Sequence, residues 1–178
     1  TPDPHPEARA AVERTVAALT GLGHEITELA HAPFDDHALA QEFLLTWFVS
    51  VAASVAEVRR LTGAPDDAFE RDTRIMAALG RATSGVDYVA AVQKRHEHAR
   101  RLTAFFDEHD LLLTPTLATP PPRIGEFDLP LPLRAASDLL LRTGTAGVLR
   151  RTSIVDDMVE KNLGWVPYTQ LANITGRP

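Results

Sequence analysis

The chain has 178 residues, 44% of them hydrophobic, which suits one domain or a large part of one. It has no cysteine, which excludes a disulfide framework, a cysteine-based zinc site and a thiol nucleophile. The formal net charge of −6 argues against a nucleic-acid partner, since such proteins present a basic surface. No leader or targeting signal is visible, so we expect a cytoplasmic protein, and both ends read as cut from a longer chain.

The first stretch predicts a helix followed by a strand. Residues 5–22 form an amphipathic helical pattern whose apolar positions recur at helical spacing: Ala8, Val12, Val16 and Leu19. Gly21 or Gly23 would end this helix. Residues 24–29 alternate weakly and predict a short strand, and a helix that leads into a strand is half of an α/β unit.

Residues 36–62 predict the longest helix, which Gly63 and Pro65 would stop. Its apolar run is flanked by Glu42 and Glu57 and is shorter than the roughly 18–20 residues that span a bilayer, so we expect no membrane span. Three hydroxyl residues share one face of it, and they either line a pocket or, as we favour, bond to carbonyls one turn earlier: Thr46, Ser50 and Ser54.

Two more helices are predicted at 66–83 and 87–109, the second capped by Asp87. The charged middle of the second helix is expected to be a solvated face. His96 and His98 lie there, but two positions apart they diverge on a helix, so we expect no metal site.

The segment from Asp110 to Gly125 has the most distinctive sequence. Leu111 to Leu113 predict a buried strand that either ends at Pro115 or lies at a sheet edge there, and three prolines from Pro120 then hold the chain extended. A strand that delivers a hydroxyl-rich loop to the surface often carries functional groups. The alternative, which this segment alone favours, is a stiff crossover loop without chemistry.

The last part predicts a loop at 126–133, short helices at 134–142 and 147–162, and a turn between them. Residues 164–178 contain Pro167, which suits the first turn of a short helix, and Gly176, which suits its left-handed end. Asn173 and Thr175 precede that end and are placed to tie the turn to a neighbouring loop, unless they belong to a capped helix and nothing more.

Four segments, taken in this order, resemble the C-terminal half of the amidase signature family of serine hydrolases. They are the helix that begins His5-Pro6-Glu7, the run at 22–25, the motif DLLLTPT with its proline tail, and the motif PYTQLANITGRP. The resemblance covers nearly the whole chain. It implies an α/β fold in which a mixed β-sheet is wrapped by helices on both faces. It also implies that residues 1–178 are the C-terminal part of a single amidase-type domain.

The family's catalysis uses a serine nucleophile, a second serine in a cis peptide and a lysine, and none of these maps onto this chain. A serine hydroxyl needs a base before it can attack an amide. The serines here are isolated, and Lys94 and Lys161 are the only lysines. Two local pairs are weaker alternatives: Asp156 and Asp157 diverge on a helix, and Ser153 with Asp157 predicts a local hydrogen bond. We therefore assign no catalytic residue, no cofactor and no metal.

The resulting hypothesis is a fragment of an amidase that hydrolyses a linear carboxamide through an acyl-serine intermediate. The fragment would supply packing and part of the substrate pocket, and it would be inactive alone. Its small-molecule amide substrate would bind together with the missing catalytic half. Formation of a homodimer is a further possibility that the sequence leaves open. Seven residues are expected near substrate, the last two as an apolar wall: Thr114, Thr116, Tyr168, Thr169, Asn173, Phe43 and Trp47. The alternative is a stand-alone helical binding or assembly module without chemistry.

Overall fold

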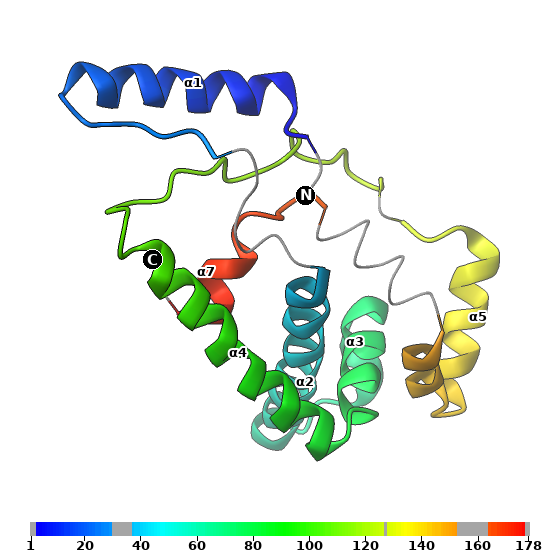
Figure 1. Ribbon diagram of the computed structural model, residues 1–178. Helices are drawn as coiled ribbons and strands as arrows, with labels where there is room; N and C mark the ends of the chain where they lie inside the picture. Colours follow the sequence, from blue (N-terminus) through cyan, green and yellow to red (C-terminus); the bar gives the residue numbers. More distant parts are fainter. Residues whose placement is uncertain (1–2, 30–36, 127, 153–163, 177–178) are drawn as a thin grey trace. The chain divides into compact units, whose positions relative to one another are not determined.

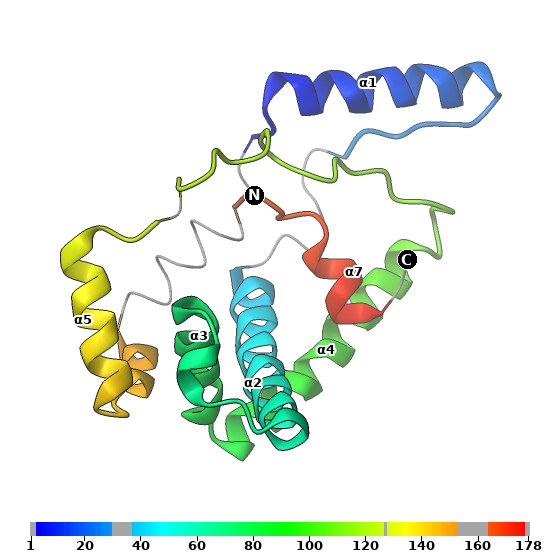
Figure 2. The same ribbon diagram turned by 180° about the vertical axis from the view of Figure 1, so that it is seen from behind.

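The computed structural model describes residues 3–29, 37–126, 128–152 and 164–176. Within these ranges the chain forms helices joined by turns and irregular segments (Figures 1 and 2). The helices are α1 (Pro6–Gly21), α2 (His37–Thr62), η1 (Asp66–Ala68), α3 (Arg71–Arg81), α4 (Gly85–Phe105), α5 (Leu131–Arg142), η2 (Ala146–Arg151) and α7 (Gln170–Thr175).

No strand occurs in the described ranges, so the predicted α/β fold with a mixed sheet is wrong for this part of the chain, which is helical. The two predicted strands, 24–29 and 111–113, lie outside regular secondary structure. A strand needs a neighbour that completes its backbone hydrogen bonds. Among the described residues the backbone of 111–117 has no hydrogen-bond partner, and the apolar run therefore forms no sheet.

The chain divides into two compact units, and each combines stretches that are far apart in sequence. Unit 1 comprises Thr1–Ala40, Lys94–Pro121 and Val159–Pro178, and unit 2 comprises Gln41–Gln93 and Pro122–Met158. Helices α2 and α4 each contribute residues to both units. The expectation that residues 1–178 belong to a single domain stays a prediction.

In unit 1 the predicted first helix is confirmed as α1. Pro6 starts it, and the ring Nδ1 of His5 accepts a hydrogen bond from the Glu7 amide at 3.3 Å. The four apolar positions of the predicted stripe are all half-buried. At the other end of the unit, Gly176 has a φ of 69° and closes α7 in the predicted left-handed conformation. Pro167 precedes α7 instead of lying in its first turn, because that helix starts only at Gln170.

In unit 2 the predicted long helix is confirmed as α2. Leu44, Phe48 and Val55 on its buried face belong to the core. The hydroxyls of Thr46 and Ser50 bond to the carbonyls of Glu42 and Thr46 at 3.0 and 2.9 Å, so the structural interpretation of the hydroxyl stripe holds for these two residues. The positive φ of Gly63, 70°, ends the helix where the sequence predicted.

By length and composition, Ala38–Thr62 of α2 is long and apolar enough to cross a membrane. One such helix is weak evidence, because the core helix of a soluble protein passes the same test. The buried positions on α2 are occupied by core side chains such as Leu44 and Phe48. The absence of a membrane partner remains an expectation.

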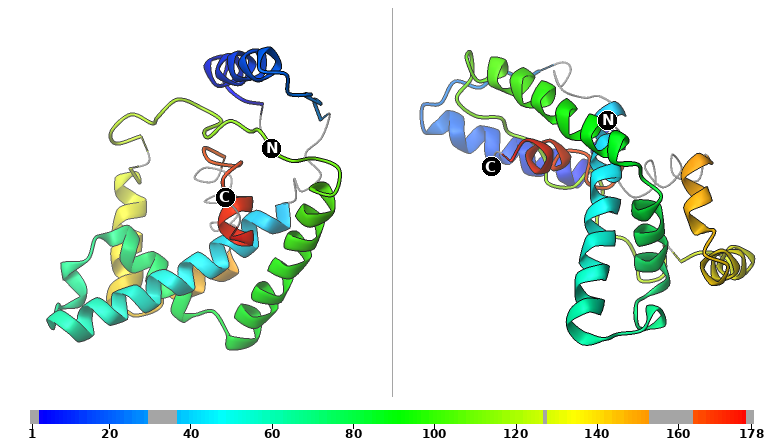
Figure 3. Two further views of the ribbon diagram at one scale, coloured as in Figure 1. Left: turned by 90° about the vertical axis from the view of Figure 1, so that its left-hand side faces the viewer. Right: turned by 90° about the horizontal axis from the view of Figure 1, so that it is seen from below.

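The predicted helix at 66–83 is two elements, η1 and α3, because Phe69 and Glu70 take non-helical backbone angles between them. Helices α3 and α2 lie side by side (Figure 3). Gly80 of α3 lies against the backbone of Phe48 and the side chain of Ala52 on α2. Because glycine has no side chain, the axes of α2 and α3 can approach closely at this crossing.

The next helix, α4, is capped by Ser84, whose Oγ accepts from the Asp87 amide at 3.0 Å, so the predicted cap at Asp87 is wrong. Asp87 instead pairs with Arg150 of η2 at 2.9 Å. Helix α5 starts three residues earlier than predicted, at Leu131. Of the predicted helix at 147–162, residues 146–151 form η2, and 153–162 lie outside the described residues.

The close contact at Gly80 yields a first prediction. We expect Gly80→Ala to lower the free energy of unfolding by about 1–3 kcal/mol, because its Cβ would overlap the Phe48 carbonyl and overpack the crossing. Urea denaturation followed by circular dichroism measures the change. The matched control is Gly85→Ala at the start of α4, where a Cβ meets open space and the effect should stay within about 0.5 kcal/mol. Equal effects at both glycines would contradict the packing argument.

Candidate functional site

A groove of about 400 Å³ lies in unit 1 between α1 and the segment 113–120. The floor and walls combine small apolar side chains of the helix with the threonines and prolines of the segment. The two walls are joined directly, because the His5 amide donates to the Ala118 carbonyl at 2.7 Å. The groove is larger than the cavity of about 120 Å³ in unit 2 that is described below.

Local sequence explains each wall. Proline at the start of α1 suits a helix whose first amides have no intrahelical partner, and the apolar stripe then faces inward through Ala8 and Val12. The opposite segment cannot continue a helix, since Pro115 and Pro120 lack amide donors and restrict the residue before them. The result is a helix face set against an extended, hydroxyl-bearing chain.

Three threonines of the segment line the groove. Thr114 and Thr116 are exposed, so their hydroxyls are available to a bound molecule. The Oγ1 of Thr119 is shielded from solvent and has no hydrogen-bond partner among the described residues. A buried hydroxyl without a partner is unfavourable, which marks this wall of the groove as locally unsatisfied.

The other predicted residues of unit 1 lie on a segment bonded to this wall. The Ala118 amide donates to the Trp165 carbonyl at 3.0 Å, which places 164–170 beside the proline segment. Tyr168 and Thr169 follow three and four residues later and are half-buried. Asn173 uses its side-chain amide locally, donating to the Thr169 carbonyl at 3.1 Å. Thus Thr114 and Thr116 line the groove, whereas these three do not appear in its lining.

The predicted apolar wall lies in unit 2. Phe43 and Trp47 stack along α2 with ring centroids 6.4 Å apart, and Trp47 also stacks on Phe48 at 6.1 Å. Phe48 belongs to the core, whereas Trp47 is 42% exposed. Whether this wall serves the same site as the threonines stays a prediction.

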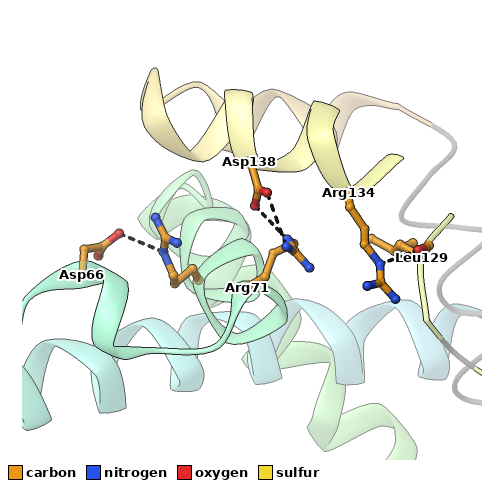
Figure 4. A network of polar contacts seen from close by, with 6 residues as sticks. Asp66, Arg71, Leu129, Arg134 and Asp138 are labelled. Atoms are coloured by element: carbon orange, nitrogen blue, oxygen red, sulfur yellow. Dashed lines mark hydrogen bonds and ion pairs between the residues drawn. The ribbon is translucent and has the colours of Figure 1, made fainter. Parts of the chain in front are cut away.

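A second polar feature, in unit 2, joins α3 to α5 (Figure 4). Arg71 donates two hydrogen bonds to the Asp138 carboxylate, from Nε to Oδ1 at 2.7 Å and from Nη2 to Oδ2 at 3.3 Å. The hydrogen bond from Arg71 holds the pKa of the Asp138 carboxyl below its usual range, and the pKa of Arg71 is raised by the same bond. Next to them, Arg134 donates to the Leu129 carbonyl at 2.6 Å and pairs with Asp128 at 2.8 Å.

The comparisons identify the family. The amidase family model matches residues 1–155. The chain belongs to the amidase family. The resemblance predicted from the motifs is therefore confirmed, although the β-sheet inferred with it is not found in the described residues.

Curated amidase relatives align along almost the whole chain. The chain is 29% identical over 174 residues to a putative amidase AmiC of Mycobacterium leprae and 25% identical over 176 residues to a 6-aminohexanoate-cyclic-dimer hydrolase of Pseudomonas sp. strain NK87. It is 26% identical over 172 residues to a putative amidase of Synechocystis. In each case 97% of the chain is covered, but only 32%, 32% and 27% of the relative, so the chain spans about a third of their length. No solved structure matches.

Sequence reasoning missed two features of this amidase chain. The Arg71–Asp138 pair joins residues 67 positions apart, and unlike charges on separate helices carry no sequence signal of contact. His98 was placed on a solvated face but is only 2% exposed, and its Nδ1 lies 2.6 Å from Arg101 Nη2. An arginine donor requires that ring nitrogen to accept, which places the proton of a neutral His98 on Nε2. The one sequence signal that the charged run of α4 is partly buried is the apolar stripe of this helix, in which Leu102 is also buried.

No group of three metal-ligating residues occurs in the described ranges. The weaker catalytic alternatives, Ser153, Asp156 and Asp157, lie outside the described residues, as does Lys161.

The Arg71–Asp138 pair predicts a pH dependence. Because the folded pKa of Asp138 is depressed, the unfolded chain binds a proton more readily, and the pair stabilises the fold above the usual Asp pKa. We expect wild type to melt above Asp138→Asn at neutral pH, with the difference vanishing as the pH falls through the depressed pKa. Thermal melts across acidic pH test this, with Asp67→Asn as the control for general charge effects. A difference that persists unchanged in acid would contradict it.

Proposed function

We propose that this chain is the C-terminal part of an amidase that hydrolyses a linear carboxamide through an acyl-serine intermediate. In this proposal the chain shapes part of the substrate pocket and packs against the catalytic part, which supplies the nucleophile. The observation that carries the proposal is the coincidence of amidase family membership with a groove lined by Thr114 and Thr116, which the sequence had singled out as near substrate.

The chemistry of amide hydrolysis supports this division of roles. A serine nucleophile must lie next to a base, and donors must await the developing oxyanion. Two serines of the described part have other tasks: Ser50 donates to the Thr46 carbonyl inside α2, and Ser84 caps α4. The amidases that match are about three times as long as this chain, which leaves room for a catalytic region in them.

The groove suits the acyl or leaving-group side of an amide. Its helical wall presents Ala8, Ala11 and Val12, which favour an aliphatic chain, together with the polar side chains of Glu7 and Thr15. Its extended wall presents the exposed hydroxyls of Thr114 and Thr116, which can donate to or accept from an amide group. We propose a small aliphatic amide as the substrate, without choosing among such amides.

The alternative, a closed helical module without chemistry, is less well supported. Leu111 is 78% exposed and Leu113 is 43% exposed, beside a backbone segment without hydrogen-bond partners among the described residues. A self-sufficient module would bury such a run. A part of a larger enzyme would have it covered by the remainder. Cytoplasmic location, homodimer formation and the absence of nucleic-acid partners remain predictions.

The proposal predicts the outcome of covalent labelling. A fluorophosphonate probe reacts with activated serines, so we expect no adduct on this chain alone and one adduct on the polypeptide that carries the catalytic serine when that part is present. Intact-mass spectrometry before and after labelling measures this. Heat-denatured samples control for non-specific reaction. An adduct on the isolated chain, or hydrolysis of an amide by the isolated chain, would contradict the claim that this chain lacks the nucleophile.

The groove can be tested in the active amidase. We expect Thr116→Val to raise KM about two- to tenfold with little change in kcat, as for the loss of one hydrogen bond made equally in ground and transition states. The matched control is Thr103→Val on α4, because the Thr103 hydroxyl bonds to the Ala99 carbonyl and does not line the groove. An active enzyme whose KM is unchanged in a Thr114→Val/Thr116→Val double variant would refute the pocket role and leave the amidase assignment intact.

A further inference from the structure

A second cavity, of about 120 Å³, lies in unit 2 where α3 and α5 begin. Four of its five lining residues are charged: Arg71, Asp72, Asp128 and Arg134, with Leu129 as the fifth. The cavity therefore differs from the mixed groove of unit 1, and its ligand must be small and strongly polar.

Both arginines are held in place before any ligand arrives. Arg71 uses Nε and Nη2 on Asp138, and Arg134 uses Nε on the Leu129 carbonyl (Figure 4). Arg134 also pairs through Nη2 with Asp128. Among the described residues Nη1 of each guanidinium has no partner, which leaves a donor free on each of these two lining residues. Guanidinium groups that are already fixed lose little side-chain entropy when they bind a carboxylate.

The helix starts favour a negative group at the same place. Neither α3 nor α5 has a side-chain cap hydrogen bond, so no capping group competes for their first amides. The amino ends of helices carry partial positive charge and attract anions. The partial positive charge of the two helix starts therefore adds to the positive charge of the two guanidinium groups.

Nearby carboxylates would nevertheless repel a simple anion. Three carboxylates, Asp72, Asp128 and Asp138, accompany the two arginines, and the carboxylate of Asp72 has no hydrogen bond or ion pair among the described residues. A bare anion would face this carboxylate, and a bare cation would face the arginines. A ligand with both charges satisfies the two sides together.

We propose that this pocket binds a small zwitterion, an α-amino acid of the size of glycine or serine. Its carboxylate is held by Arg71 and Arg134, and its ammonium is held by Asp72. The volume corresponds to about four water molecules at ~30 Å³ each, which limits the ligand to a few non-hydrogen atoms. The proposal does not depend on amide hydrolysis, so it stands or falls separately from the function proposed above.

The test is a titration of the 178-residue chain by ¹H–¹⁵N NMR, which follows the backbone amides of residues 71–73, 131, 133 and 134. We expect glycine and L-serine to shift these signals with a dissociation constant on the order of millimolar, as for a ligand of this size. Acetate and methylammonium, each carrying one of the two charges, should bind at least about tenfold more weakly. Acetate binding as tightly as glycine would show a plain anion site and overturn the proposal, as would a lack of shifts with glycine.

Two variants separate ligand binding from helix stability. Asp72→Asn should weaken glycine binding about tenfold while acetate binding is unchanged or stronger. The matched control is Glu70→Gln, which removes a negative charge from the same end of α3 but does not line the pocket, and it should leave glycine binding within about twofold. If both variants weaken binding equally, or neither does, Asp72 does not hold the ammonium and the proposal fails.

Discussion

The peptide group of Ala118 connects the parts of unit 1. Its carbonyl accepts from the His5 amide and its amide donates to the Trp165 carbonyl, so one buried residue joins three distant stretches of sequence. Buried backbone groups must be paired, and each pairing here is long-range. Since Ala118 is fully buried, neither bond can be exchanged for water without opening the unit. The bond from His5 ties the proline segment to the residue before α1, and the groove lies between that helix and the segment.

Unit 2 is organised by a different kind of contact. Gly80 lets α3 lie against the backbone of α2, and Gly147 lets η2 approach Ala82. Helix α5 has no buried side chain, so apolar burial alone does not attach it. It is held to α3 by the Arg71–Asp138 fork, and η2 is held by Arg150 on Asp87 and on the Ala82 carbonyl. Such half-exposed ion pairs fix geometry more than they add stability, which makes the region suited to positioning charged groups.

The sequence predicted the helices because their signals are local. Apolar spacing located α1 and α2, and Gly63 and Gly176 marked two helix ends correctly. Strands at 24–29 and 111–113 were predicted from equally local patterns, but a strand forms only when a distant segment pairs with it. The same limit applies to the sites. Thr114 and Thr116 could be named from a motif, whereas the pocket at Arg71 and Arg134 depends on helices whose contact leaves no trace in the sequence.

The exposed leucines at Leu111 and Leu113 connect the fold to the family. Leaving large apolar side chains in water forgoes on the order of 1–3 kcal/mol for each one that could be buried. In the described residues this cost coincides with an unpaired backbone at 111–117, and both lie next to the groove. Two unsatisfied features at one place are what our proposal of a larger amidase explains, because further polypeptide would cover this surface. The amidases that match are about three times as long and have the sequence to supply that cover, which is why we favour a part of an amidase over a self-contained module.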